Sequence, residues 1–139
     1  MRILAFDFGL GHIGVAVGNS EFGTCQELKA LRARDGIPEE IALKAVFSEW
    51  APQRIVVGLP LNMDGTEQEM TRRARKFGNR TAAKFRLPVV FIDERLTSAE
   101  AKSEIFREGG FRALVRDKGH IDSISAVKIL EQYFVENPA

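Results

Sequence analysis

The sequence predicts an α/β fold in which a mixed five-stranded sheet carries helices on both of its faces. Three strand-like segments follow one another near the N-terminus with short turns between them, which favours antiparallel pairing. Two later strand-like segments are each preceded by a helical segment, which favours parallel crossovers. A chain of 139 residues is also large enough for one domain, residues 1–139, to bury a core without disulfides.

Apolar runs and turn residues predict the three antiparallel strands. Residues 2–8 form an almost continuous apolar run, residues 12–18 form a second, and the glycines of segment 9–11 supply a tight turn between them. A third extended segment covers about residues 24–34 and ends before turn residues 35–38. We expect the first strand to be central, because the first crossover strand would pair along its other side.

Helical periodicity alternates with the two parallel strands that follow. A helix is expected over residues 38–50, with Pro38 at its start. Its expected inward face consists of Ile41, Ala45, Val46 and Trp50. Residues 54–60 read as a buried strand and residues 67–86 as a helix. The inner stripe of this second helix consists of Met70, Ala74, Phe77, Thr81 and Phe85.

The last part of the chain is predicted to hold one strand and two helices. Residues 89–93 form the strand, and a capping box at residues 97–100 opens a helix that ends near residue 110. A loop is expected over residues 111–119 and a final amphipathic helix over residues 122–136.

Composition excludes several classes of protein. The net charge is +1, so a nucleic-acid-binding role has to depend on where the charge lies. The single cysteine, Cys25, allows no internal disulfide, favours a reducing compartment, and suits a half-buried apolar position better than a catalytic one. No apolar run reaches membrane-spanning length and no signal-peptide pattern opens the chain, so we expect a cytoplasmic protein without a membrane partner.

Three acidic residues lie where a metal-dependent nuclease would carry them. Asp7 lies within the first strand, Glu94 closes the last strand, and Asp122 opens the final helix. The predicted topology brings these ends to one edge of the sheet, and converging carboxylates need a cation between them. We therefore expect Asp7, Glu94 and Asp122 to be catalytic residues and metal ligands.

The metals that suit this set are Mg²⁺ or Mn²⁺, because carboxylate oxygens are hard ligands. Two such ions about 4 Å apart can activate a water and stabilise the leaving oxygen of a phosphodiester. Asp7 is the best candidate to bridge both ions, because it comes from the central strand.

Each acid also has a structural explanation. Asp122 could cap the last helix, and Glu94 could form a surface ion pair with Arg95. Asp93 should point to the opposite face of the sheet from Glu94, which makes it a weaker candidate. Asp7 is the hardest to explain by structure alone, because its neighbours are apolar.

The helix before the last strand is strongly basic, with seven cations and no acid between residues 70 and 86. A solvated face is the ordinary explanation, but phosphate contacts would use the same pattern. The loop 111–119 adds cations near Asp122. The expected nucleic-acid-binding residues are Arg72, Arg73, Lys76, Arg80, Arg112, Arg116 and Lys118. The loop at residues 62–66 either faces the substrate or is a plain turn.

Several motifs in order resemble the bacterial YqgF/RuvX family. They are Phe6-Asp7-Phe8-Gly9 with Ile13-Gly14-Val15-Ala16, then residues 57–65, residues 93–97 and residues 122–126. The resemblance covers nearly the whole chain and implies an RNase H-like fold related to Holliday junction resolvases. It also implies a nuclease that processes the 5′ end of the 16S ribosomal RNA precursor, with ribosome assembly particles as possible partners. The family's acidic positions fall on Asp7, Glu94 and Asp122.

One segment departs from the family pattern. The family commonly has a Lys or Arg between Asp7 and Ile13, whereas this chain has only His12 there as a basic side chain. A phosphate contact is therefore either missing or supplied by protonated His12.

Other functions stay open on the sequence. A Holliday junction resolvase acting on branched DNA makes two symmetric cuts and needs a dimer, whereas the sequence indicates only a monomer or weak dimer. A non-catalytic RNA- or ribosome-binding protein would use the same basic helix. The ATPase fold of actin and the sugar kinases opens with a similar Asp-x-Gly motif, but it needs a second domain for which this chain is too short.

Overall fold

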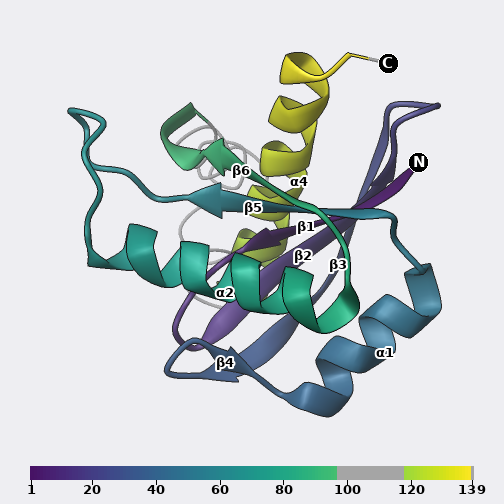
Figure 1. Ribbon diagram of the computed structural model, residues 1–139, viewed down its shortest axis with the longest axis horizontal. Coiled ribbons are helices and arrows are strands. Elements are labelled where there is room, and N and C mark those ends of the chain that lie inside the picture. Colours follow the sequence, from purple (N-terminus) through teal and green to yellow (C-terminus); the bar gives the residue numbers. More distant parts are fainter. Residues whose placement is uncertain (97–117, 139) are drawn as a thin grey trace.

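The computed structural model describes residues 1–96 and 118–138, except for the side chains of residues 96 and 118–122. Six strands form one sheet in the order β4-β3-β2-β1-β5-β6 (Figure 1). The strands are β1 (Arg2–Asp7), β2 (His12–Asn19), β3 (Thr24–Arg34), β4 (Ile37–Pro38), β5 (Arg54–Leu59) and β6 (Val89–Asp93). The helices are α1 (Glu40–Trp50), α2 (Glu69–Phe85) and α4 (Lys118–Glu136), with a 3₁₀ turn at Glu94–Leu96.

Strand β1 is central, as predicted. It pairs antiparallel with β2 on one side and parallel with β5 on the other. The β2–β3 pair is antiparallel and the β5–β6 pair is parallel. The mixed sheet predicted from the sequence is therefore confirmed, and the carboxyl ends of β1, β5 and β6 point toward the same side of the molecule (Figure 1).

The sheet has six strands rather than the five expected, because β4 folds back onto the end of β3. Asp35 and Gly36 have φ angles of 50° and 80°. Positive φ at two consecutive turn residues gives the tight hairpin turn that an Asp-Gly pair favours. Pro38 consequently lies in β4 instead of opening the helix, and α1 begins at Glu40.

Helices cover both faces of the sheet, as predicted (Figure 1). Helices α1 and α2 pack on one face, where the core includes Leu4, Phe6 and Phe8 of the central segment. Helix α4 packs on the other face, against Ile3 and Ala5. Because side chains alternate along a strand, these two sets assign each β1 residue to one face.

The inner stripe predicted for α2 is confirmed, whereas the inward face predicted for α1 is wrong in part. Ile41 is 87% exposed, and the buried α1 residues are Leu43 and Phe47. The ring of Phe47 stacks on that of Phe85 from α2 with centroids 3.7 Å apart. Contacts of Phe47 with Phe85 of α2 and with Phe6 of β1 therefore turn this side of α1 inward.

Helix α4 begins at Lys118, four residues before the expected start. The first two of these residues belong to the predicted loop 111–119, so that prediction is wrong at its end. The predicted helix over 97–110, with its capping box, lies outside the described residues. Within the described part of the chain, none of the helices is long and apolar enough to cross a membrane.

Candidate active site at the carboxyl edge of the sheet

Asp7 ends the central strand on the face covered by α4. Ala5, two residues earlier, lies in the α4-side core, while Phe6 and Phe8 lie in the core under α1 and α2. The alternation of a strand therefore directs Asp7 toward α4. Its exposure is intermediate, which leaves it accessible at the edge of the sheet.

Glu94 lies on the same face, directly after β6. Ile92 belongs to the α4-side core, and the side chain of Glu94 is only 8% exposed. A Cβ added at Gly58 of β5 would lie 3.5 Å from the Glu94 carboxyl carbon. The Glu94 carboxyl group therefore lies over Gly58.

Gly58 separates the two acids and has no side chain to fill the space between them. Phe6 pairs with Val57, so Asp7 comes level with Gly58, and Gly58 pairs with Ile92 on β6. Asp7 and Glu94 thus flank one glycine at the carboxyl edge of three parallel strands.

The start of α4 is fixed beside the same edge. The Ser123 hydroxyl donates a 2.6 Å hydrogen bond to the Leu28 carbonyl of β3. Leu28 pairs with Val15, which in turn pairs with Phe6. Ser123 therefore lies in the row of the sheet that comes just before Asp7.

Asp122 directly precedes Ser123, and its backbone lies within α4. Because the helix begins at Lys118, the alternative role of Asp122 as an N-cap is wrong. Its side chain lies outside the described part, and no group of three potential metal ligands occurs among the side chains that the structure describes. The convergence of Asp122 with Asp7 and Glu94 stays a prediction.

Asp93, the weaker candidate, is held by Arg95. Arg95 donates to it through Nε at 3.0 Å and through an Nη at 2.6 Å. This hydrogen bonding and charge hold the pKa of the Asp93 carboxyl below its ordinary value. The alternative that Arg95 pairs with Glu94 receives no support, because Arg95 pairs with Asp93.

Arg95 also clamps the loop that follows β5. Its other Nη lies 3.0 Å from the Met63 carbonyl, and Gly65 donates within the loop to the Asn62 carbonyl. Asp64 accepts hydrogen bonds from the Thr66 hydroxyl at 2.6 Å and from its backbone N–H at 3.0 Å. The segment 62–66 is therefore an ordered turn beside the acidic edge, and Met63 at its tip is 97% exposed.

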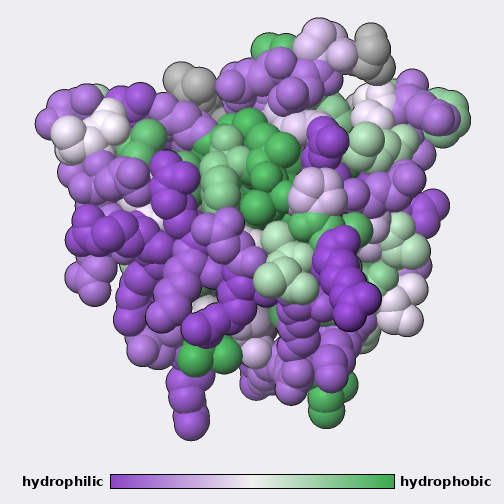
Figure 2. Space-filling model, viewed as in Figure 1, coloured by the Kyte–Doolittle hydropathy of each residue, from purple (hydrophilic) through white to green (hydrophobic). Residues whose placement is uncertain are grey.

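Three of the basic residues of α2 have counter-charges that the sequence did not predict. Arg73 pairs with Asp35 at 3.0 Å, and Lys84 pairs with Glu40 at 2.6 Å. Arg75 pairs with Glu67 at 2.9 Å. Within the described residues, Arg72, Lys76 and Arg80 have no ion-pair partner. Hydrophilic side chains gather over α2 on the face shown in Figure 2.

The remaining predicted nucleic-acid-binding residues belong to the C-terminal part of the chain. Arg112 and Arg116 lie outside the described residues, and Lys118 is placed by its backbone alone, at the start of α4.

An arginine lies beside the segment where the sequence departs from the YqgF/RuvX pattern that it resembles. His12 on β2 pairs with Arg32 on β3, and Arg34 lies two residues further along. These three residues and Glu39 line one hollow next to the 9–11 turn. Arg32 therefore supplies a cation close to the segment between Asp7 and Ile13, from a strand that is distant in sequence.

Sequence reasoning missed Gly58, Ser123 and Arg95 as supports of the site. Gly58 carries a recognisable signal, because glycine inside a buried strand often marks a close approach of another group. The partners of Ser123 and Arg95 depend on tertiary contacts with Leu28 and Met63. A single sequence therefore offers no signal for them.

Solved structures of resolvases share this architecture. The fowlpox virus resolvase in complex with Holliday junction DNA matches with a TM-score of 0.62 at 9% identity, over 100% of both chains. RuvC from Thermus thermophilus matches with a TM-score of 0.56 at 14% identity, over 98% of this chain and 96% of that one. These likenesses show the fold, which is RNase H-like.

The sequence relatives are much closer. A model of the family described as "RuvX: Holliday junction resolvase" matches residues 1–136. A protein of Actinobacillus succinogenes named "Putative pre-16S rRNA nuclease" is 55% identical over 138 residues, which cover 99% of this chain and 97% of the relative. The chain belongs to the RuvX family. It is thus a member of a family of nucleases with the RNase H-like fold.

Proposed function

We propose that the protein is a divalent-metal-dependent endonuclease that trims the 5′ end of precursor 16S ribosomal RNA. The observation that carries this proposal is the placement of Asp7 and Glu94 on either side of Gly58, on the face covered by α4. The name of the Actinobacillus succinogenes relative supports the substrate. We further propose that residues 1–139 act as one nuclease domain, since one sheet carries the described helices on both faces.

Asp7, Glu94 and Asp122 are the proposed catalytic residues and metal ligands. Carboxylate oxygens at the edge of a sheet suit Mg²⁺ or Mn²⁺, and the intermediate exposure of Asp7 fits access by a hydrated cation. When bound, the cations supply a water activated for attack on phosphorus and stabilise the leaving oxygen. The close approach of Glu94 to Gly58 and the hydrogen bond from Ser123 to Leu28 support a site that is arranged before substrate arrives.

The substrate-binding surface is proposed to include α2 and the segment before α4. Arg72, Lys76 and Arg80 are free to contact phosphates, because they have no ion-pair partner in the described part of the structure. Arg73 forms an ion pair with Asp35, so its charge is partly neutralised. Arg112, Arg116 and Lys118 are proposed to extend this surface, and the setting for the reaction is a ribosome assembly particle in the cytoplasm, with the protein a monomer or weak dimer.

The test compares cleavage of a precursor 16S ribosomal RNA fragment with cleavage of a four-way DNA junction, each with Mg²⁺ or Mn²⁺. Asp7→Asn, Glu94→Gln and Asp122→Asn should each lower the cleavage rate by roughly a hundredfold or more while RNA binding persists. Glu49→Gln removes an exposed carboxylate of α1 as the matched control and should cleave normally.

The second candidate function is junction resolution, favoured by the resolvase fold of the fowlpox and Thermus proteins. Symmetric cutting of the four-way junction with no cutting of the RNA would put this candidate first. If neither nucleic acid is cut although the RNA binds, a non-catalytic RNA-binding role would replace both.

A further inference from the structure

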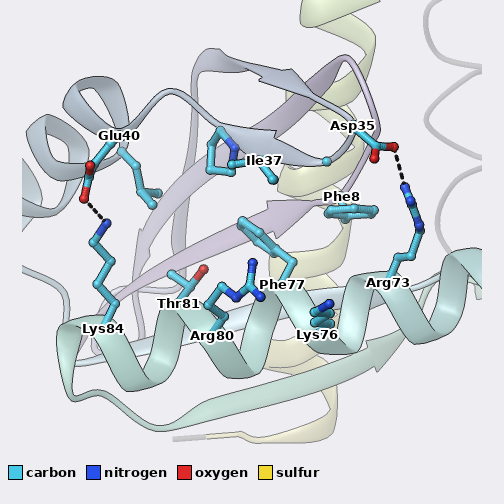
Figure 3. A pocket seen from close by; sticks show the side chains of 13 residues that line it. Phe8, Asp35, Ile37, Glu40, Arg73, Lys76, Phe77, Arg80, Thr81 and Lys84 are labelled. Atoms are coloured by element: carbon cyan, nitrogen blue, oxygen red, sulfur yellow. Dashed lines mark hydrogen bonds and ion pairs between the residues drawn. The ribbon is translucent and has the colours of Figure 1, made fainter.

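A pocket of about 370 Å³ lies between α2 and the β3–β4 hairpin (Figure 3). It is on the opposite face of the sheet from Asp7 and Glu94. This volume is within the range of roughly 300–1,000 Å³ that small-molecule sites occupy. Its two walls are α2 and the short strand β4 with the turn before it. The function proposed above gives this pocket no specific role.

Among the described residues, two cations in the pocket have no counter-charge, although the cations on either side have one. Arg73 and Lys84 are held by Asp35 and Glu40 at 3.0 and 2.6 Å. Lys76 and Arg80 project from α2 between these pairs, and neither has an ion-pair partner among the described residues (Figure 3). The two outer pairs fix the ends of the pocket, and the middle presents two unneutralised positive charges.

The floor and the opposite wall of the pocket are apolar. Phe8 and Phe77 form the floor and are only 9% and 7% exposed. Ile37, which is 62% exposed, and Pro38 form the wall that faces α2. An anion alone would need no such wall, so the lining fits a ligand that combines an anionic group with an apolar, flat part.

The pocket is connected to the acidic edge through Phe8, the residue after Asp7. A Cβ added at Gly36 would lie 2.6 Å from the tip of the Phe8 ring, so the hairpin turn packs closely on that ring. Asp35 in the same turn holds Arg73. A group bound in the pocket would therefore rest on the chain segment that carries Asp7.

We propose that this pocket binds one unpaired nucleotide of a nucleic-acid strand. The phosphate lies against Lys76 and Arg80, and the base packs against Ile37 and the apolar floor. A base in a duplex brings its partner strand with it, and α2 and β4 line the pocket on two sides, so we expect the pocket to favour a single-stranded position. This inference rests on the proposed nuclease function, since the nucleotide belongs to the substrate strand.

The first experiment compares three small probes by NMR titration of the full chain: AMP, ribose 5-phosphate and inorganic phosphate. AMP should bind most tightly and should shift the Ile37 methyl signals together with the amides of residues 76–81. Equal affinities for AMP and inorganic phosphate, or shifts outside the pocket, would overturn the assignment of a base to the apolar wall.

Charge-matched variants test the two cations. The double variant Lys76→Gln with Arg80→Gln should raise the Kd for AMP about tenfold for each cation removed. The control, Lys29→Gln with Arg86→Gln, removes two exposed cations outside the pocket and should change this Kd less than twofold. Equal weakening by both double variants would show a general charge effect and would overturn the proposal.

A substitution in the apolar wall distinguishes the contribution of the base to binding from that of the phosphate. Ile37→Ser should weaken AMP binding several-fold and leave binding of inorganic phosphate unchanged, with little loss of stability because Ile37 is exposed. Weakening of both probes to the same extent would contradict contact between the base and Ile37.

Binding of a short single-stranded RNA and of its duplex distinguishes a strand from a free nucleotide. The double variant Lys76→Gln with Arg80→Gln should weaken binding of the single strand more than binding of the duplex. Equal weakening of both would overturn the selection of an unpaired position. AMP binding should persist in Asp7→Asn, because the pocket lies on the other face of the sheet. If the pocket proposal is wrong, AMP does not bind there but the parent protein still cleaves the RNA. If the nuclease proposal is wrong, the parent protein does not cleave the RNA but still binds AMP.

Discussion

Gly58 is the residue on which the spacing of Asp7 and Glu94 depends. A Cβ at this position would overlap the Cδ1 of Ile129 and would lie 3.1 Å from its Cγ1. Extra volume in a packed core generally costs about 1–3 kcal/mol. We therefore expect Gly58→Ala to lower the free energy of unfolding by about that amount and to weaken binding of Mn²⁺.

The second step of this test uses Ile129→Val, which removes the Cδ1 atom. Urea denaturation should show that the double variant Gly58→Ala with Ile129→Val is more stable than the sum of the two single effects predicts. Simple additivity of the two effects would contradict the overlap.

Cys25 is half-buried and packs at the margin of the α4-side core, which agrees with its predicted apolar role. Desolvation, with a smaller contribution from the charge of Glu131, raises the pKa of the Cys25 thiol to about 11. At pH 8, alkylation by iodoacetamide should be roughly a hundredfold slower than in unfolded protein, because little thiolate is present. Equal rates in native protein and in urea would contradict this environment.

At the scale of elements, Arg95 connects the end of β6 to the loop after β5. It contacts Asp93 and the Met63 carbonyl at 2.6 and 3.0 Å. Arg95→Gln should therefore speed amide hydrogen exchange at Gly65 and Thr66 several-fold, while the free energy of unfolding changes little because the ion pair is partly exposed. Arg86→Gln is the control. Unchanged exchange rates in Arg95→Gln would show that hydrogen bonds within the loop are sufficient to keep it ordered.

The helices also show where the local apolar pattern is sufficient to predict which face of a helix is buried. The stripe of α2 was predicted correctly, because it buries a full row against the central strands. The face predicted for α1 is wrong in part, because Phe47 stacks on Phe85 of α2 and on Phe6 of β1, which turns Phe47 and Leu43 inward. Such contacts with distant segments decide which face of a short helix is buried.

At the scale of the whole molecule, four carboxylates carry lowered pKa values, and two of them, Asp35 and Glu40, connect segments that are distant in sequence. Arg73 lowers the pKa of Asp35, Lys84 that of Glu40, Thr66 that of Asp64 and Arg95 that of Asp93. The unfolded chain then binds more protons in acid than the native protein does. The contribution of these groups to stability is therefore present above their ordinary pKa values and is lost as pH falls through the lower native values.

Stability measured by urea denaturation should accordingly rise between about pH 2 and pH 5. Arg73→Gln removes the partner of Asp35, so the slope of stability against pH should become smaller in this variant. A slope equal to that of the parent would contradict the role of this pair.

The basic surface predicts how nucleic-acid binding depends on salt. Replacing Arg72, Arg73 and Lys76 with Ala should weaken binding of a single strand and reduce the slope of log K against log salt by about 0.7 for each phosphate that the variant no longer neutralises. Arg72→Ala should reduce the slope more than Arg73→Ala, because Asp35 already neutralises Arg73. An unchanged slope in the triple variant would exclude α2 from binding phosphates.

Within the described residues, the sequence by itself determined the order of the strands and helices other than β4, the central place of the first strand and the edge position of Asp7 and Glu94. These features follow from local periodicity and from the short connections of α/β folds, which act within a few residues of chain. Only the tertiary structure decided the partners of the α2 cations, the close approach of Glu94 to Gly58, and the pocket beside β4. Each of these depends on contact between side chains that are distant in sequence, and such contacts are set when the whole core packs.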